Sequence, residues 1–408
     1  MPAASYDAPA MERSVRGSAA STALRGRSAV IGLAELKPSK TPEGRTPLGL
    51  ITEASLAALA DAGLKPSDVD GIVVCPAMMQ YSMLWPSVVA EHLGLAPTYL
   101  EFVDLGGATS CAMVARAATA IANGQASTVL CVNGDTWDPK GMYLKPPPLF
   151  SPMRDFTMPY GAAGANADYA MAARLHMHRY GTTSRQLAKI AADQRASAQQ
   201  NPLALFHGKP LTIDDVLASA MVCDPLHLLE VVMPCTGAEA IVLTSAERVK
   251  DHPHRPAWVL GFGEHLEPDP FQRPDFLVTP AVESARQAFR MAGLAPKDVT
   301  LAEIYDCYTS AVLIELEDAG FCAKGEGGPF LESHDLTYAG DFPLNTNGGM
   351  LSFGQPGLGG GMTLVVEGAR QVMGRAGARQ VKRNDVAFVH GNGGTFTEEC
   401  SLIFASDR

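Results

Sequence analysis

The chain has 408 residues, of which 47% are hydrophobic, and a formal net charge of -11 at pH 7. This composition can supply a large buried core, or two packed halves of one. The acidic balance and the lack of a basic stripe argue against a nucleic-acid-binding protein. No apolar run in the sequence approaches the ~18 residues needed for a membrane span.

The eight cysteines are scattered along the chain without CxxC pairs. This pattern is typical of reduced thiols in a cytoplasmic protein, not of a disulfide framework or a zinc site. The histidines show no metal-binding spacing either, because His176 and His178 face different sides of a predicted helix. We therefore expect a cytoplasmic protein without a metal centre.

The folded part is predicted to begin after residues 1–26, a flexible N-terminal extension rich in Ala, Ser and Arg. The strand 29–33 is the first predicted element of this folded part. A helix beginning at Glu53 then ends at Gly63, and the apolar strand 71–74 follows.

The same helix–glycine–strand pattern recurs at a constant offset of 230 residues, for example from Gly63 to Gly293. A repeat of this length predicts two similar α/β halves, residues 27–250 and 251–408, whose sheets are covered by helices. Residues from about 136 to 232, with a predicted helix over 184–199, form an insertion over the first half. Such an insertion is expected to line a ligand pocket.

A glycine turn at 104–108 lies between the predicted strand 99–103 and the predicted helix 109–122. Gly107 belongs to this turn. Backbone N–H groups at such a turn can bind an anion or a developing oxyanion. The alternative is a tight turn that needs glycine only for its backbone shape.

Two side chains that can transfer protons follow a strand of the second half. Tyr305 and Cys307 lie at a strand end beside a predicted helix N-terminus, whose field favours their anionic forms. The alternative is a Tyr and a Cys that pack under the helix.

Two glycine-rich segments add further polar groups. In 345–357, Asn347 and Gly348 bring backbone close to a ligand, and Gln355 offers an amide donor and acceptor. The glycines of 357–361 follow no convincing strand, so a dinucleotide site is not expected.

The second segment follows strand 386–389, which is predicted to deliver His390 into a loop with Asn392 and Gly393. This imidazole can act as acid or base, unless loop carbonyls hold it. Polar groups at the carboxyl ends of several strands predict one active site.

From about residue 27 to the end, the chain resembles the thiolase superfamily, in its sterol-carrier-protein-type branch. The segments that carry the resemblance are 180–188 (YGTTSRQLA), 211–219 (LTIDDVLAS), 224–229 (DPLHLL) and 237–245 (GAEAIVLTS). The resemblance implies an α/β fold, the layered αβαβα thiolase-like fold with two pseudo-repeated halves and a loop insertion. It also implies a homodimer and a coenzyme A thioester substrate, without another cofactor.

The departures from the thiolase pattern concern the catalytic residues. The family's nucleophilic cysteine falls at Gly107, and Cys111 lies one helical turn further on. The Gly-His-Pro of thiolases is Gly-Gln-Pro at 354–356, and the His-Asp-Cys-Phe of the branch is Tyr-Asp-Cys-Tyr at 305–308. Because acyl transfer through a covalent thioester needs a thiolate and a base, a conventional thiolase mechanism is not expected.

The remaining residues resemble those of thiolase-like aldolases that remove acyl-CoA from steroid side chains. This resemblance implies retro-aldol cleavage of a β-hydroxyacyl-CoA, with a steroid side chain or a similarly bulky acyl group. The products are a ketone or aldehyde and a shorter acyl-CoA. It also implies a separate partner subunit with an OB-fold and a zinc ribbon, which binds acyl-CoA.

The same resemblance implies the residue roles. Tyr305, coupled to His390, transfers the hydroxyl proton, Cys307 protonates the enolate carbon, and Gln355 orients a hydroxyl. Backbone N–H groups near Gly107 and Gly393 hold the enolate oxygen.

Two other functions stay open. One is a thiolase or acyl-CoA acyltransferase of unusual mechanism, with Cys307 or Cys111 as nucleophile. The other is a non-catalytic subunit that binds acyl-CoA. Met78, Met79, Met83 and Trp85 suit a bulky apolar substrate, but an ordinary core explains them equally well.

Overall fold

The computed structural model describes residues 22–80, 82–138, 155–156, 158–161, 164–267, 273–357 and 361–408. Most of the predicted N-terminal extension, residues 1–21, lies outside the described residues, and so does much of the first part of the insertion. The predicted domain boundaries therefore stay predictions.

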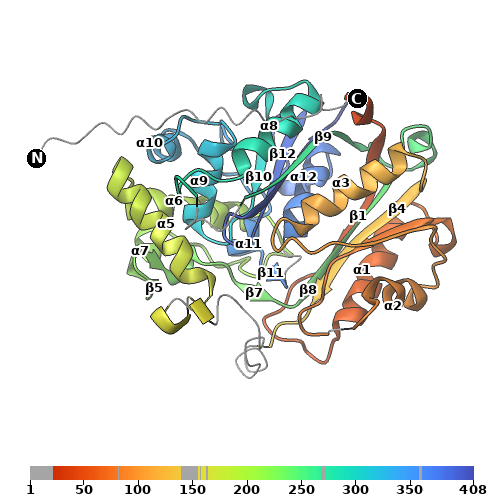
Figure 1. Cartoon of the computed structure of the whole chain (residues 1–408), viewed down its shortest axis with the longest axis horizontal. Coiled ribbons are helices and arrows are strands. Elements are labelled where there is room, and N and C mark those ends of the chain that lie inside the picture. The colour runs from red at the N-terminus through yellow and green to blue at the C-terminus, as the bar shows by residue number, and fades with distance from the viewer. Residues whose placement is uncertain are drawn as a thin grey trace, which may run out of the picture.

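A nine-stranded sheet runs through the molecule in the order β10-β12-β13-β9-β1-β8-β4-β2-β3 (Figure 1). Its strands are β1 (Ser28–Glu35), β2 (Gly71–Val74), β3 (Tyr99–Phe102), β4 (Thr128–Asp135), β8 (Gly237–Ser245), β9 (Ala257–Leu266), β10 (Leu301–Ile304), β12 (Val386–Gly393) and β13 (Glu398–Ala405). The repeat predicted from the sequence places β2 and β10 at equivalent positions, and each pairs in parallel with a neighbour, β4 or β12.

The two halves share this sheet because β1 and β9 pair with each other. The paired residues are Ala29 with Trp258 and Val30 with Ala257. The expectation of a separate sheet in each half is therefore corrected: backbone hydrogen bonds between two antiparallel strands link the halves.

Helices cover and separate the two halves of the sheet. The helices α1 (Pro47–Asp61) and α2 (Trp85–His92) contact strands of the first half, and α8 (Ala281–Ala292) contacts strands of the second. The helices α3 (Thr109–Ala122) and α12 (Met362–Val372) contact strands of both halves and form the central layer (Figure 1). The predicted αβαβα fold is confirmed.

The described part of the insertion packs on the second half, not over the first half as predicted. It contains α5 (Ala165–Tyr180), α6 (Ser184–Ala198), α7 (Ile213–Ala218), β5 (Met221–Cys223) and β6 (Leu226–His227), and β7 (Pro234–Cys235) follows it. The helices α5 and α6 contact α9 (Thr309–Asp318), and α6 also contacts α10 (Gly327–Ser333) and α11 (Gly349–Ser352). Just after the insertion, β7 pairs in parallel with β11 (Gln355–Pro356) of the second half, a contact that sequence proximity does not reveal.

Helix starts follow local capping chemistry. The first helix begins at Pro47, six positions before the predicted Glu53, because Thr46 accepts a hydrogen bond from the Gly49 N–H and proline occupies the first turn. The helix α6 begins at Ser184 as predicted, after a capping box formed by Thr183 and Gln186.

A buried ion pair anchors the glycine-rich segment that begins at residue 345. Arg379 donates to both carboxylate oxygens of Glu367 at 2.9 and 2.8 Å. The Thr346 hydroxyl contacts that carboxylate at 2.9 Å and Glu303 at 2.8 Å. Burial alone would raise the pKa of Glu367, but the charge of Arg379 outweighs it and lowers the pKa to about 2.

Substituting Arg379→Ala should leave Glu367 buried without this cation and lower the free energy of unfolding by about 3 kcal/mol. Chemical denaturation at pH 7 measures the change. The exposed Arg383→Ala is the control and should change stability by less than about 0.5 kcal/mol. Equal stability of both variants would contradict the role given to this pair.

Candidate active site

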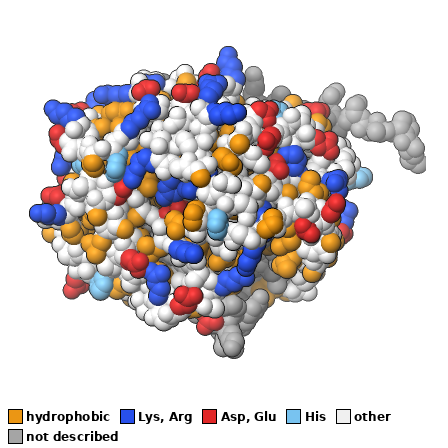
Figure 2. Space-filling model, turned by 180° about the vertical axis from the view of Figure 1, so that it is seen from behind, with side chains coloured by type: hydrophobic (Ala, Val, Ile, Leu, Met, Phe, Trp, Pro, Cys, Tyr) orange, Lys and Arg blue, Asp and Glu red, His pale blue; other side chains and the backbone are white. Residues whose placement is uncertain are grey.

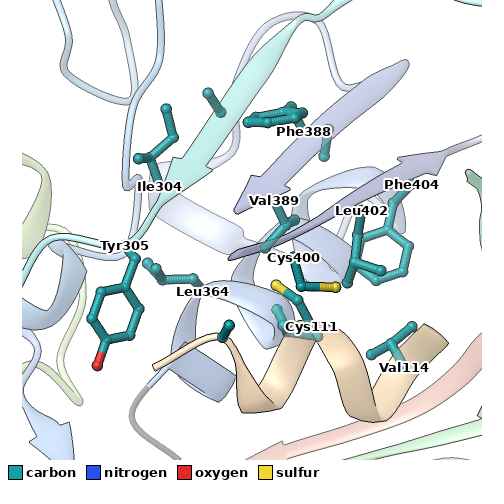
Figure 3. Packing of buried hydrophobic residues seen from close by; sticks show 14 of the residues in the cluster. Cys111, Val114, Ile304, Tyr305, Leu364, Phe388, Val389, Cys400, Leu402 and Phe404 are labelled. Atoms are coloured by element: carbon teal, nitrogen blue, oxygen red, sulfur yellow. The ribbon is translucent and has the colours of Figure 1, made fainter. Parts of the chain in front are cut away.

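The phenol of Tyr305 fills the space directly above Gly107. A Cβ atom built on Gly107 would lie 2.2 Å from Tyr305 Cζ and 2.2 Å from the Asn392 carbonyl oxygen. Figure 3 shows Tyr305 at the end of β10, with its ring directed toward the start of α3. No side chain fits at Gly107 without displacing the phenol.

The Tyr305 oxygen accepts a hydrogen bond from Gln355 Nε2 at 2.8 Å. Gln355 is positioned by β11, where its backbone N–H donates to the Met233 carbonyl at 3.0 Å. The strand β11 runs beside β7, so the segment just after the insertion sets where this amide lies. Gln355 also lines a pocket of about 150 Å³, so its amide connects the phenol to this cavity. The other lining residues are Met78, Met79, Asp135, Thr136, Trp137, Pro234 and Gly357.

Cys307 lies two residues after Tyr305 and is buried. Its thiol is hydrogen-bonded to the hydroxyl of Tyr169, a buried residue of α5. The Tyr169 ring stacks on Tyr308 at 4.3 Å and meets the edge of Phe396 at 4.9 Å. The insertion thus supplies a second phenol to this site.

Both proton-transfer candidates are neutral at rest. Burial raises the pKa of the Tyr305 phenol well above its usual value, and the nearby charge of a Cys307 thiolate would raise it further. Burial likewise raises the pKa of the Cys307 thiol, and the hydrogen bond from Tyr169 opposes that rise.

His390 lies on the opposite face of the sheet from Tyr305. It occupies the interior of β12, which continues to Gly393, so the predicted glycine loop begins later than expected. Its neighbour Gly391 faces Gly107 and Cys111, and side chains alternate along a strand. The predicted coupling of His390 to Tyr305 therefore has no direct side-chain hydrogen bond among the described residues. Their backbones are hydrogen-bonded, because the Tyr305 N–H donates to the His390 carbonyl at 3.0 Å.

The His390 ring belongs to a buried acidic cluster, Glu315, His390 and Glu399. Its Nε2 lies 3.2 Å from Glu399 Oε2, and its Nδ1 lies 2.9 Å from Ser401 Oγ. One ligand-type atom from each member of the cluster lies within 4.8 Å of the others, close enough to hold a metal ion. The expectation of a protein without a metal centre stays a prediction.

The other predicted binding residues make contacts inside the fold that hold the loops of the site in place. Asn347 donates to Thr363 Oγ1 at 2.8 Å and accepts from the Gly349 N–H at 2.8 Å. A Cβ on Gly348 would lie 2.6 Å from Ala198 Cβ, and one on Gly393 would lie 2.0 Å from the Leu105 carbonyl oxygen. Glycine at these positions therefore lets each loop pack closely against its neighbouring segment.

Asn392 also uses its side chain inside the fold. Its amide donates to Glu315 Oε1 at 2.6 Å, and its Oδ1 accepts from the Phe396 N–H at 3.0 Å. Its carbonyl oxygen, in contrast, lies at the Gly107 turn. Any contact of Asn392 with substrate would therefore come from its backbone.

The alternative nucleophile Cys111 lies in the core. It is 2% exposed, and Figure 3 shows its sulfur beside that of Cys400 among apolar side chains. Burial raises the pKa of the Cys111 thiol, so the reactive thiolate is disfavoured. This placement argues against acyl transfer through Cys111.

Sequence patterns missed Tyr169 and Glu315. Tyr169 carries no local signal, because its partner Cys307 is far away in the sequence. Glu315 does carry one: it is a carboxylate inside an otherwise apolar stretch of α9, Ala311 to Leu316. An unpaired acid in such a run is rare without a specific role.

Comparison with known proteins shows the family to which the chain belongs. Residues 264–406 match the family described as thiolase C-terminal domain-like. The chain is 35% identical to the 17-hydroxy-3-oxo-4-pregnene-20-carboxyl-CoA lyase of Mycobacterium tuberculosis, over 86% of this chain and 92% of the relative. It is 33% identical to the steroid side-chain-cleaving aldolase of Thermomonospora curvata, over 94% and 99%.

Among solved structures, the chain is similar to one described as Ltp2-ChsH2(DUF35) aldolase. The TM-score is 0.86 at 33% identity, over 95% of this chain and 99% of the other. The chain belongs to the thiolase superfamily, in the sterol-carrier-protein-type branch that includes the thiolase-like steroid side-chain aldolases.

Substituting Gly107→Ala should displace the Tyr305 ring or the Asn392 carbonyl, because the new Cβ would overlap both. We expect a loss of turnover of at least about 100-fold, with a stability loss of about 1–3 kcal/mol. Steady-state kinetics and thermal unfolding measure the two effects. Gly49→Ala, which meets only the Thr46 hydroxyl at 3.2 Å, is the matched control. Normal turnover of Gly107→Ala would show that the close contact is unimportant.

Proposed function

We propose that the protein is a carbon–carbon lyase that cleaves a β-hydroxyacyl-CoA by a retro-aldol reaction. The observation that carries this proposal is the Tyr305 phenol in the space where a nucleophile attached at position 107 would have to lie. Two relatives, named as a lyase and an aldolase, match most of the chain and support it.

In the proposed reaction, the phenolate form of Tyr305 takes the hydroxyl proton, so the active fraction of the protein is the one in which this phenol has lost its own proton to solvent. The Gln355 N–H donates to the phenol oxygen and so stabilises its anionic form. The Cα–Cβ bond then breaks, and its electron pair stays on the thioester as an enolate. Backbone N–H groups near Gly107 and Gly393 stabilise the enolate oxygen, and Cys307 protonates the carbon.

The substrate we propose is a steroid side-chain thioester or a similarly bulky one. The two relatives are named for steroid substrates. In this chain Met78 and Met79 line the pocket beside Gln355, and flexible thioethers suit an irregular apolar ligand. Trp85 is instead buried in the core at 3% exposure, so it does not extend this pocket.

A cluster of three cations around the Phe206 ring, here called the basic cluster, supports binding of the CoA phosphates. The Arg195 guanidinium lies 4.3 Å from the ring centroid, Lys40 Nζ lies at 5.5 Å and Lys209 Nζ at 5.9 Å. Among the described residues, none of the three forms an ion pair with a carboxylate. Burial lowers the pKa of Arg195 to about 10, which leaves it charged at pH 7.

Backbone hydrogen bonds link the basic cluster to the segment that leads to Gln355. The Phe206 N–H donates to the Ser352 carbonyl at 3.2 Å, and the Leu205 N–H donates to the Phe353 carbonyl at 3.1 Å. Gln355 follows two residues later. A thioester at Tyr305 can therefore extend its phosphorylated end toward unpaired positive charge.

We also propose a homodimer and a separate acyl-CoA-binding subunit. The strand β3 ends the sheet, and its Leu100 and Phe102 are 42% and 47% exposed. A second copy would cover this apolar edge. The similar structure is described as Ltp2-ChsH2(DUF35) aldolase, which supports a second polypeptide, expected to carry an OB-fold and a zinc ribbon.

Cellular location is part of the same proposal. Figure 2 shows acidic and basic side chains interspersed over one face of the molecule. In the part of the chain that the structure describes, no helix is both long and apolar enough to cross a membrane. The described cysteines are all free thiols, which supports a cytoplasmic location.

The retro-aldol reaction predicts that a β-hydroxyacyl-CoA is cleaved to a ketone or aldehyde without added CoA. Tyr305→Phe should lower kcat by at least about 100-fold, because the group that takes the substrate's hydroxyl proton is lost. Mass spectrometry of both products measures this. An absolute requirement for free CoA would indicate thiolysis instead.

The Tyr305 role has a pH signature. Because burial raises the pKa of the phenol, the phenolate fraction rises tenfold per pH unit below that pKa. The parent protein should therefore gain activity as the pH rises from 7 to 9, and the residual activity of Tyr305→Phe should not follow this trend.

Lys40→Ala combined with Lys209→Ala should raise KM for a CoA thioester about tenfold, or about 1.4 kcal/mol, with kcat unchanged. The corresponding pantetheine thioester, which lacks the nucleotide, should be unaffected. Lys297→Ala, an exposed lysine outside the cluster, is the control. An equal KM increase for both thioesters would indicate that the CoA phosphates do not bind at the basic cluster.

A further inference from the structure

The proposed reaction does not use the buried acidic cluster. Glu315 lies on α9, His390 on β12 and Glu399 on β13, and all three are 0% exposed. One ligand-type atom from each lies within 4.8 Å of the others. Among the described residues, neither carboxylate forms an ion pair with an arginine or a lysine. Two acidic groups therefore share a place where burial makes uncompensated negative charge costly.

The strand register gathers the polar side chains of this cluster on one face of the sheet. His390 lies opposite Ser401 in the pairing of β12 with β13. Two residues along, Asn392 lies opposite Glu399. Side chains of facing residues, and of every second residue along a strand, point to the same face. Helix α9 brings Glu315 to this face, where it contacts the Asn392 amide.

Each carboxylate has one oxygen bound to the fold and one without a partner. The Asn392 amide donates to Glu315 Oε1 at 2.6 Å, and the Thr279 hydroxyl donates to Glu399 Oε2 at 3.3 Å. The remaining oxygens, Glu315 Oε2 and Glu399 Oε1, have no hydrogen-bond partner among the described residues. Buried polar atoms are nearly always paired, so two such oxygens in one cluster indicate a ligand that binds them.

The histidine is held in the same manner, with one ring nitrogen bound to the fold. The Ser284 hydroxyl donates to the Ala281 carbonyl at 3.4 Å, and it lies 3.1 Å from the Ser401 hydroxyl. Ser401 can therefore donate to Ser284 and accept from His390 Nδ1, which lies 2.9 Å away. The other nitrogen, Nε2, then directs its lone pair toward the carboxylates, 3.2 Å from Glu399 Oε2.

This division of labour is typical of metal ligands. A histidine that binds a metal ion through one nitrogen donates the other N–H to the protein, and a ligating carboxylate is itself hydrogen-bonded. All three members of the buried acidic cluster have such an outer partner, namely Asn392, Thr279 and Ser401.

Protons alone fit the arrangement less well. A proton on Glu315 Oε2 would need an acceptor, and this oxygen has no hydrogen-bond partner among the described residues. Burial and the charge of Glu399 raise the pKa of Glu315 well above its usual value, so the two ionised groups are unstable together without positive charge. A divalent cation with two carboxylates and a neutral imidazole leaves no net charge.

We propose that Glu315, His390 and Glu399 form a structural binding site for a divalent transition-metal ion. One imidazole nitrogen and two carboxylate oxygens suit Zn²⁺, which binds such atoms at about 2.0–2.2 Å. Ligand atoms around a tetrahedral ion at this distance lie roughly 3.4 Å apart, so small side-chain rotations bring the cluster onto the ion. Sequence spacing did not indicate this site, because its ligands come from three separate elements.

Bound at this position, the ion links the helix that follows Cys307 to two strands beside the Gly107 turn. Helix α9 begins two residues after Cys307, and β12 ends at Gly393, which packs against the Leu105 carbonyl. The site therefore stabilises the fold behind the glycine turn. This role is independent of the retro-aldol reaction, so its test needs no measurement of turnover.

The zinc content of the purified protein tests the proposal. Because the cluster is fully buried, the ion is supplied during folding: the protein is produced in medium with added zinc sulfate and then dialysed against buffer without zinc. Elemental analysis should give about one zinc per chain. Glu315→Gln, alone or with Glu399→Gln, should retain less than about a fifth of that amount, since ligands are lost.

Glu332→Gln is the control, the same substitution at an exposed glutamate outside the cluster. It should retain as much zinc as the parent. Full retention of zinc by the cluster variants would show that the ion binds elsewhere and would overturn the proposal. A parent protein with less than about 0.2 zinc per chain would overturn it as well.

Two measurements on the parent protein cover the case in which the cluster variants do not fold. Protein produced with zinc should unfold at a temperature at least about 3 °C above that of protein produced in zinc-depleted medium. Equal midpoints would contradict the structural role. Protein produced with Co²⁺ should show the visible bands of nitrogen and oxygen coordination, whereas a sulfur-to-cobalt charge-transfer band would assign the ion to cysteines and overturn the site.

Discussion

The close contact between Tyr305 and Gly107 is the constraint on which the rest of the site depends. The phenol lies against the turn with 2.2 Å between its Cζ and the position of a Cβ at residue 107, so the turn must be glycine. A thiolase-type nucleophile and this phenol cannot occupy the same space. The fold therefore keeps the glycine turn of its family, and the reaction proposed here uses proton transfer in place of covalent chemistry.

The positions of Tyr305 and Gln355 are determined by elements far apart in the sequence. Tyr305 follows the short strand β10, whereas Gln355 is held by β11 against β7, just after the insertion. The insertion also brings Tyr169 to Cys307. It packs on the second half, where Tyr305 and Cys307 lie, and its Tyr169 opposes the rise in the pKa of the thiol.

Burial of charge is used in two different ways in this molecule. Glu367 is ionised because Arg379 compensates it, and the pair is part of the scaffold. Glu315 has no arginine or lysine partner among the described residues, and burial together with the charge of Glu399 raises its pKa well above the usual value. A buried carboxylate with a paired arginine stays ionised, whereas burial without such a cation favours the protonated form.

The sequence by itself determined the α/β class, the repeat, the ends of α3 and the start of α6. These features follow from the spacing of hydrophobic residues, the positions of glycines and the residues that cap helices. It also determined that the Gly107 turn lacks a sulfur, since residue identity is enough for that. Only the tertiary structure decided that Tyr305 faces Gly107 while His390 faces Glu399. Alternation along β10 and β12 sends these side chains to opposite faces of one sheet, and the pairing that sets those faces joins residues distant in the chain.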